Sequence, residues 1–472
     1  MRELFDKALS LCKTLVLTPK RTTKARGFIV TECISNSLGF SSVDRREVLG
    51  DFLGGRLTSD AGILLLKEVD QRIGLLDAIN QAIPDPRDPL MTIHKQRTML
   101  AQRIFSIALG YEDLNDQQSM RTDAALQTAA GVRPEEDQPM ASPSTLCRLE
   151  NRVVRQTLVK LSKVLVDQFI ASYDSPPEEI TLDFDATDGR VHGQQEGRFF
   201  HGYYRHYCFL PLYVFCNSQP LLAYLRPSKI DGAKHAKAIT KLLVEYLRQA
   251  WPDVKIIIRG DGGFCRWKLL RWCEKHDVSY CIGACRNKVL ERHAATLMEQ
   301  AEAQFEATGE KVRLFDETIY SASTWDKERR VIIKSERLEQ GLNTRFVVTN
   351  LPDPPQQLYD GIYAMRGDME NRIKEQQLML FADRTSCHDF QANQFRLLLS
   401  TFAFVLMDAL RRDYLKGTEL EKAQCSTIRL KLFKIAARVR VTVRRVWFHF
   451  SSSYPHQALL RTLSSRLAPD SG

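Results

Sequence analysis

The order of strand-like and helix-like segments in the middle of the chain constrains its fold more than any other feature. Residues 180–187 (ITLDFDAT) alternate apolar and polar side chains, and aromatic and aliphatic strands follow at 207–216 and 221–225. A helix over 233–250, the β-branched strand 254–258 (VKIII), a second helix (RWKLLRWCEKH) and a last strand (SYCIGAC) complete the run. Three strands followed by strand–helix–strand units predict an α/β fold with a mixed sheet.

Composition excludes several other classes of protein. Of the 472 residues, 44% are hydrophobic and 26% charged, which is ordinary for a folded protein and excludes a mostly disordered chain or a collagen. Lysine and arginine outnumber aspartate and glutamate by 67 to 57, and the net charge of +10 favours a polyanionic partner such as nucleic acid. The most apolar stretch, 397–407, is much shorter than the ~20 residues that cross a bilayer, so we expect no membrane partner.

Several acidic residues lie at positions where carboxylates can indicate a metal-binding or catalytic site. Asp183 and Asp185 lie two apart, so both point to one face of their strand. Asp261 directly follows the apolar strand, beside glycines that allow close approach of the backbone. Glu370 lies on a later helix, predicted over about 358–381. Carboxylates at strand ends and on a covering helix can converge at one edge of a sheet and hold two Mg²⁺ ions for phosphodiester cleavage.

The helix that carries Glu370 has a polar stripe. Tyr363, Arg366, Glu370, Lys374 and Gln377 are spaced by three or four residues, which places them on one helix face. A carboxylate, a guanidinium and an aromatic ring together suit a metal ion and a phosphate. From the spacing alone, a solvated helix face with charge pairs four residues apart is the favoured alternative. The neighbouring apolar stripe that would seat the helix on the sheet is Ile362, Met365, Met369 and Ile373.

Together these motifs resemble the insertion-sequence transposases of the DDE class. The strand LDFDATD, the segment HGQQEGRFFHGYY, the turn RGDGGFCR and the helix YAMRGDMENRIKEQQ carry the resemblance, which covers about residues 57 to 412. Tyr363, Arg366 and Glu370 match the first three positions of the Y-R-E-K signature of one group. The fourth position holds Gln377 where the signature has lysine, although Lys374 shares its helix face. The resemblance implies a catalytic domain of the RNase H (retroviral integrase) fold.

The same resemblance implies the catalytic residues. Asp185, Asp261 and Glu370 match the catalytic, metal-binding carboxylates of the class. An aspartate closely followed by threonine selects Asp185 as the first of them, with Asp183 and Asp188 as alternatives. Two Mg²⁺ ions are implied, with Mn²⁺ able to substitute. In the implied mechanism water attacks the phosphate at the transposon end, and the freed 3′-OH attacks the other strand or target DNA.

Residues that contact DNA are implied in the same way. Arg366 would hold a phosphate near the scissile bond and Tyr363 would position the terminal nucleotide, with Lys374 and Gln377 beside them. Related transposases stack a flipped base on a tryptophan of the β insertion. Trp325 is the candidate here, and its alternative role is that of an ordinary strand aromatic.

The C-terminal region is basic. After Glu421 no acidic residue occurs before Asp470, and arginines alternate with aromatic residues, a pattern that suits a phosphate backbone. The alternative is a solvated amphipathic helix. The candidate DNA contacts are Arg438, Arg440, Arg444 and Arg445.

The shifts in composition and the resemblance predict the domain organisation. Capped helices in the second part suit a DNA-binding module, with a plain helical bundle as the alternative. The expected parts are a loosely ordered basic N-terminal segment (1–56), a helical DNA-binding domain (57–178), the first part of an RNase H-like catalytic core (179–287), an inserted subdomain of a helix and β strands (288–352), the completing helices of the core (353–415) and a basic C-terminal tail (416–472).

The expected function is therefore that of a DNA transposase. It would bind the terminal inverted repeats of its own insertion sequence and catalyse metal-dependent strand cleavage and strand transfer. Its partners would be double-stranded DNA of the element ends and of the target, bound by a dimer, in a bacterial cytoplasm at the nucleoid. The alternatives are a nuclease of the same fold without strand transfer and a catalytically silent DNA-binding protein derived from a transposase. The three intact carboxylates argue against the silent alternative.

Overall fold

The chain forms two compact units, Met1–Gly55 and Arg56–Gly472. The computed structural model describes residues 37–134 and 138–468. In the first unit, β1 (Leu38–Val43) and β2 (Arg46–Gly50) form an antiparallel hairpin whose side chains are largely exposed. Most of the expected basic segment 1–56 lies outside the described residues.

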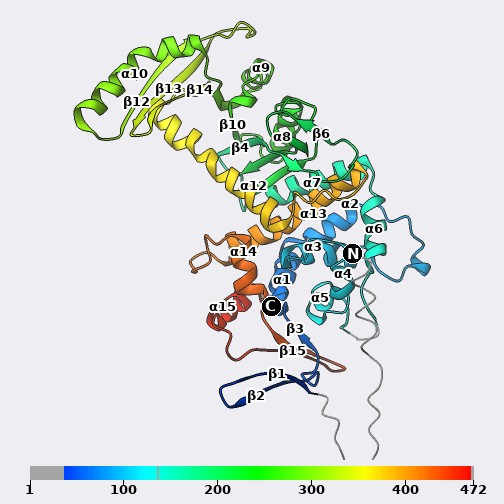
Figure 1. The fold of residues 1–472 in the computed structure, drawn as a ribbon. Helices are drawn as coiled ribbons and strands as arrows, with labels where there is room; N and C mark the ends of the chain where they lie inside the picture. The colour runs from blue at the N-terminus through cyan, green and yellow to red at the C-terminus, as the bar shows by residue number, and fades with distance from the viewer. Residues whose placement is uncertain (1–36, 135–137, 469–472) are drawn as a thin grey trace, which may run out of the picture. The chain divides into compact units, whose positions relative to one another are not determined.

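After the short strand β3 (Leu57–Thr58), the second unit continues with a group of helices, coloured blue to cyan in Figure 1. Gly74 ends the first of them with a φ of 65°, a left-handed conformation that glycine adopts without strain. Ser142 caps another through its side chain, and Pro143 fits the first helical position because no N–H is needed there. The helices are α1 (Leu64–Ile73), α2 (Leu75–Ala82), α3 (Gln96–Leu109), α4 (Gln117–Met120), α5 (Ala124–Ala129), α6 (Pro143–Asn151) and α7 (Arg155–Ala171).

A mixed sheet of eight strands follows, and it confirms the predicted α/β class with a mixed sheet. Its order is β12-β13-β14-β11-β10-β4-β8-β9. Strands β4, β10 and β11 run parallel to one another, and the other pairs are antiparallel. The strands are β4 (Glu179–Ala186), β8 (Leu212–Cys216), β9 (Gln219–Tyr224), β10 (Lys255–Gly260), β11 (Ser279–Ala284), β12 (Val312–Tyr320), β13 (Arg329–Leu338) and β14 (Gly341–Thr349).

Two details of the sheet differ from expectation. The stretch 207–216 is not one strand, because Pro211 lacks an N–H for a strand ladder. Its first half, β7 (His206–Phe209), joins β5 (Gly189–Arg190) and β6 (Phe199–His201) in a separate small sheet. The strands β12–β14, expected in an inserted subdomain of their own, continue the large sheet, since β14 pairs with β11. This pairing removes a free edge from β11.

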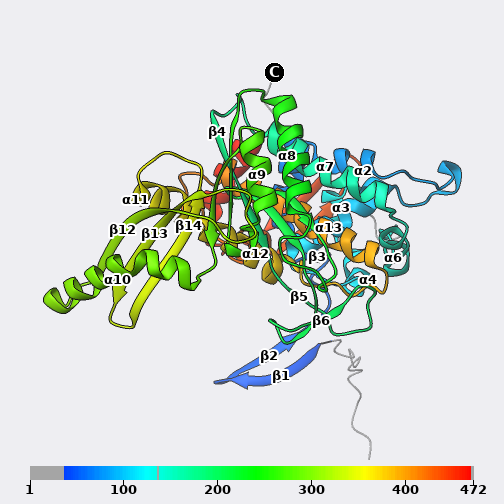
Figure 2. The ribbon, with the colours of Figure 1, turned by 90° about the horizontal axis from the view of Figure 1, so that it is seen from above.

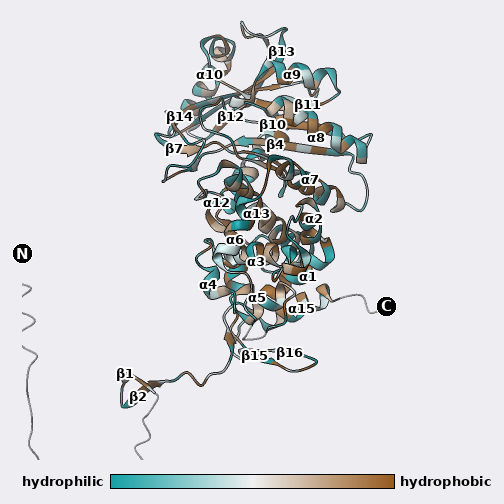
Figure 3. Ribbon diagram, turned by 90° about the vertical axis from the view of Figure 1, so that its right-hand side faces the viewer, coloured by the Kyte–Doolittle hydropathy of each residue, from teal (hydrophilic) through white to brown (hydrophobic). Residues whose placement is uncertain are grey.

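Helices cover both faces of the large sheet (Figures 1 and 2). Leu182 and Phe184 pack with α8 (Ala236–Ala250) and α9 (Trp267–Lys275) in one core. On the other face, residues of β8 and β9 pack with α13 (Phe390–Ala409), which also lies beside α3 (Figure 3). Side chains alternate between the two faces of a strand, so Asp183 and Asp185 point to the side of α13. The sheet thus separates the expected catalytic aspartates from the α8–α9 layer.

The end of the chain is a β-hairpin followed by a helix. Strands β15 (Ala437–Val441) and β16 (Val446–Phe450) pair antiparallel, and α15 (Gln457–Leu467) follows. The alternative of an amphipathic helix is therefore wrong for residues 437–450. Ala437 and Val439 are buried, whereas Arg438 and Arg440 are exposed. This alternation has a period of two, which fits a strand and not a helix.

Candidate active site

The two aspartates of β4 have different surroundings. Asp183 is buried and forms a two-pronged ion pair with Arg259 of β10, in which Nη2 donates to Oδ2 at 2.6 Å. Arg259 also donates to the carbonyl of Ile362. Asp185 lies two residues further along the same face of β4 and is partly exposed. Asp183 therefore has a fixed cationic partner. Asp185 is the β4 carboxylate that lies nearer the C-terminal end of the strand.

Asp261 follows β10 at the same level of the sheet as Asp185. The parallel register pairs Arg259 with Asp183, so two residues further on Asp261 stands beside Asp185. The Asp261 carboxylate accepts a hydrogen bond from the amide of Gly263 at 2.9 Å, which fixes the turn after the strand. A strand-end aspartate with a defined backbone partner is held in one orientation.

Glu370 reaches the same place from an irregular helical segment. The expected regular helix over 358–381 is interrupted: α11 (Pro355–Leu358) passes into a π-helical turn (Tyr359–Tyr363), a 3₁₀ turn (Ala364–Arg366) and then α12 (Gly367–Leu380). Met365 is consequently exposed, whereas Met369 and Ile373 are buried as expected. Single π-helical turns occur frequently at functional sites.

The charges of these carboxylates interact. Burial raises the pKa of Asp185 to about 6, and the negative charges of Asp261 and Glu370 contribute to the rise, while Arg366 opposes it. Arg366 pairs with Glu370 at 2.6 Å between Nη2 and Oε1. Burial tends to lower the pKa of Arg366, but Glu370 and the two aspartates raise it overall. The three carboxylates and the Arg366 guanidinium therefore share one neighbourhood.

This donor set fits divalent cations. Carboxylate oxygens are the ligands that Mg²⁺ prefers, and mutual repulsion of three carboxylates is what a divalent cation would relieve. In the described parts of the chain, no three His, Cys, Asp or Glu side chains are arranged closely enough to hold a metal ion as they stand. The Arg366 guanidinium occupies the position beside Glu370 instead.

Tyr363 packs closely over the neighbouring strand. A Cβ atom built on Gly283 of β11 would lie 2.6 Å from the Tyr363 hydroxyl, so only glycine leaves room for this ring. Burial raises the pKa of Tyr363, Arg366 lowers it and Asp261 raises it further. The hydroxyl therefore lies within the electrostatic field of the carboxylates. The sequence analysis did not identify Gly283 or Arg259 as site residues. The sequence signal that could have indicated them is their position near the ends of predicted strands.

The other expected site residues lie in three places. The Gln377 amide donates to the carbonyl of Asp188 at 3.0 Å, and Lys374 is exposed on the same helix. Trp325 lies between β12 and β13, half-buried against Tyr320 and under the Arg329 guanidinium. The four C-terminal arginines are all exposed on or between β15 and β16, and they are Arg438, Arg440, Arg444 and Arg445.

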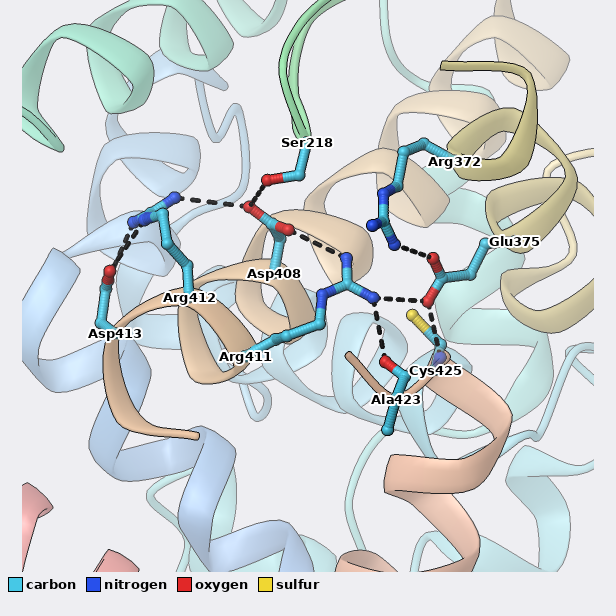
Figure 4. A network of polar contacts seen from close by, with 9 residues as sticks. All are labelled: Ser218, Arg372, Glu375, Asp408, Arg411, Arg412, Asp413, Ala423 and Cys425. Carbon is cyan, nitrogen blue, oxygen red and sulfur yellow. Dashed lines mark hydrogen bonds and ion pairs between the residues drawn. The ribbon is translucent and has the colours of Figure 1, made fainter. Parts of the chain in front are cut away.

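A buried ion network holds α12 against its neighbours (Figure 4). Glu375 accepts from Arg411 at 2.8 Å, from Arg372 at 2.9 Å and from the amide of Cys425 at 2.6 Å. Arg411 also pairs with Asp408 at 2.9 Å. Glu375 lies five residues after Glu370 in the same helix, so these contacts fix the rotation of α12 and thereby the position of the Glu370 carboxylate.

Replacing Asp185 by asparagine should stabilise the metal-free protein. The raised pKa means that ionised Asp185 costs folding free energy at pH 7, so the neutral amide should raise the free energy of unfolding by about 1–2 kcal/mol. The gain should shrink as pH falls through about 6, because the wild-type carboxyl then becomes neutral in the folded state. Thermal unfolding in EDTA checks this, with the exposed Asp316→Asn as control. A less stable Asp185→Asn protein would contradict it.

Comparison with known proteins places the chain in a family. The family model described as transposase DDE domain, group 1, matches residues 40–471. The chain therefore belongs to this family of transposases, and the resemblance drawn from its motifs is confirmed.

Two other comparisons, with solved structures and with curated proteins, do not narrow the function further. Among solved structures, the chain matches the piggyBac transposase in a synaptic complex with hairpin DNA. The TM-score is 0.41 with 11% sequence identity, over 88% of this chain and 87% of the other. Likeness at this level carries no argument about function. No curated protein matches the chain in sequence.

Across the described residues no helix is long and apolar enough to cross a membrane.

Proposed function

We propose that this chain is an active DNA transposase that cuts and joins strands at the ends of its own insertion sequence. One observation carries the proposal: in a chain of a transposase family, Asp185 of β4 lies close enough to Asp261 at the end of β10 and to Glu370 of α12 that their negative charges, after burial, raise its pKa. Structural ion pairs do not require such repulsion, whereas sites that bind metal ions and phosphates do. Asp185, Asp261 and Glu370 are the proposed catalytic residues.

The same three carboxylates are the proposed ligands of two Mg²⁺ ions, with Mn²⁺ as a substitute. Bound there, the ions would activate a water and stabilise the leaving oxygen of a phosphodiester. Asp261 contributes an orientation fixed by the Gly263 amide, and Asp185 contributes a partly exposed carboxylate on the adjacent strand. Arg366 would then exchange its contact with Glu370 for a DNA phosphate, to which a guanidinium binds through two N–H groups.

The remaining expected contacts keep their proposed roles. Tyr363 would position the terminal nucleotide, with Lys374 and Gln377 beside it on α12. Trp325 would stack on a flipped base, which requires its ring to leave the partly buried position against Tyr320. No covalent protein intermediate is needed, because a 3′-OH released by hydrolysis can itself attack a second phosphate.

We further propose an RNase H-like core for this site. The run of three antiparallel strands, followed by two strands parallel to the first, supports it. Asp185 lies on β4, which is the middle one of these five strands in the sheet order. The helices of 57–178 are the proposed DNA-binding domain, and the segments 179–287 and 353–415 the two parts of the core. Binding of two element ends by a dimer completes the proposal.

The basic hairpin, defined as β15–β16 (Ala437–Phe450), is the proposed contact to the phosphate backbone. Arg438 stands opposite His449 and Arg440 opposite Trp447, so one exposed face carries two cations and two aromatic rings. The turn between the strands adds Arg444 and Arg445. Strand β15 also pairs with β3, which makes the hairpin part of a three-stranded sheet, and the cations on its exposed face would neutralise phosphates.

Removing Arg438 and Arg440 together should weaken binding to all DNA sequences alike. Because each phosphate contact releases about one counterion, the slope of log K against log salt should fall by about 2. Fluorescence anisotropy at several salt concentrations measures this slope. Lys241→Ala on α8 removes an exposed cation from elsewhere and should leave the slope unchanged. An unchanged slope in the double variant would remove the basic hairpin from the interface.

The test of the proposed function is strand joining. Purified protein with Mg²⁺ and a DNA fragment ending in the sequence that flanks its own gene should insert that end into a target plasmid. Cleavage without joining would favour the nuclease alternative. Tight DNA binding without cleavage would favour a silent DNA-binding protein.

A further inference from the structure

The aromatic hairpin, defined as β6–β7 with its turn (Phe199–Phe209), has no role in the site described above. It is rich in aromatic and basic residues, and several of its rings are exposed. Tyr203 at the tip is 84% exposed, Phe200 58% and Tyr207 47%. Large rings lose favourable burial when they are left in water, so an exposed group of this kind indicates a binding surface.

One face of the aromatic hairpin is fixed to the carboxylate site. His206 contacts the Asp188 carboxylate at 2.7 Å, and Gln377 of α12 donates to the carbonyl of the same aspartate. Asp188 lies three residues after Asp185 in the chain. Burial raises the pKa of Tyr204 to about 12, with further contributions from the charges of Asp188 and Asp185. The aromatic hairpin therefore stands next to the proposed catalytic carboxylates.

The opposite face is open to solvent. Phe200 and Tyr207 are direct partners across the strands, and their ring centroids are 5.7 Å apart in an edge-to-face arrangement. The Arg198 guanidinium lies 4.4 Å from the centre of the Tyr207 ring. Exposed aromatic rings beside a cation form the kind of surface on which nucleic acid bases stack while the phosphates are neutralised.

We propose that the aromatic hairpin binds unpaired nucleotides of the DNA strand next to the scissile phosphate, with Tyr203 and Phe200 stacking on their bases. Bases within a duplex are covered on both faces by their neighbours, so exposed rings can stack only on nucleotides that have left the helix. This inference rests on the proposed function, and it adds single-stranded character to the DNA at the cleavage site. It assigns the aromatic hairpin a positioning role and no chemical step.

The test compares two DNAs in EDTA. One is a blunt duplex and the other is the same duplex with a short single-stranded 3′ extension. Tyr203→Ala and Phe200→Ala should each weaken binding to the extended DNA by about 10-fold, since stacking on one base contributes ~1–3 kcal/mol. Binding to the blunt duplex should stay unchanged. Tyr203→Phe keeps the ring and should bind both DNAs like the wild type, as should Leu242→Ala, which removes an exposed apolar side chain of α8.

The outcomes separate this inference from the proposed function. Equal affinities of all variants for the extended DNA would overturn the inference, whether or not the wild type cleaves DNA. Loss of extension-specific affinity in a protein that never cleaves would uphold the binding of unpaired nucleotides by the aromatic hairpin and overturn the proposed function. Variants that change only the concentration dependence of self-association would also overturn it, because the exposed rings would then belong to an interface between copies of the chain.

Discussion

Asp261→Asn should reduce metal-dependent strand cleavage by at least about 1000-fold while leaving DNA affinity within about twofold. A loss of that size corresponds to ~4 kcal/mol of transition-state stabilisation, as expected when a metal-binding carboxylate becomes a neutral amide. The fold should be unaffected, because the asparagine oxygen can still accept the hydrogen bond that the Gly263 amide donates to Asp261. Single-turnover cleavage of a labelled element end, paired with a gel-shift measurement, checks both parts.

Asp183→Asn is the informative comparison for this variant. Asp183 is the partner of Arg259 and makes no proposed contact with the metal ions. Its replacement should mainly lower stability, and cleavage measured well below the unfolding temperature should fall less than for Asp261→Asn. Full cleavage by Asp261→Asn would remove this residue from the catalytic set.

The second large effect is expected at the buried ion network. Arg411→Met should lower the free energy of unfolding by about 3–5 kcal/mol, because Glu375 and Asp408 would stay buried without their shared cation. Glu375 lies in the helix of Glu370, so cleavage should also fall at temperatures where the variant remains folded. Chemical denaturation and cleavage rates measure the two effects.

Arg372→Met is the matched control. Arg372 donates to the same carboxylate, Glu375, but its side chain is partly exposed and it has no contact with Asp408 among the described ion pairs. The loss of one partly exposed partner should cost about 1 kcal/mol or less. Equal destabilisation by the two variants would show that Arg411 is not the centre of the network.

Much of the candidate site could be predicted from local sequence. A period of two places Asp183 and Asp185 on one face, and parallel strands end at the same edge of a sheet, which brings Asp261 beside them. The α/β class followed from the order of strands and helices. The face and the sheet edge at which these carboxylates lie follow from the local pattern and from the direction of the strands, so they can be predicted without knowing the register of the strands.

Other features depend on contacts between distant segments. The ion pair of Asp183 with Arg259 requires the register of β10 on β4, which no local pattern encodes. The π-helical and 3₁₀ turns before α12 are stabilised by packing, and a regular helical spacing hides them. The pairing of β14 with β11 likewise joins segments that are far apart in the chain, and sequence reasoning therefore separated them.

The central claim is that Asp185, Asp261 and Glu370 form one metal-dependent site for DNA cleavage. The most direct measurement is cleavage of DNA that carries the flanking sequence of the gene, with Mg²⁺ or Mn²⁺ and with an EDTA control, for the wild type and each single amide variant. We expect nicking at one fixed terminal position in the wild type only, and only with metal. Cleavage that persists in EDTA, or in any of Asp185→Asn, Asp261→Asn and Glu370→Gln, would contradict it.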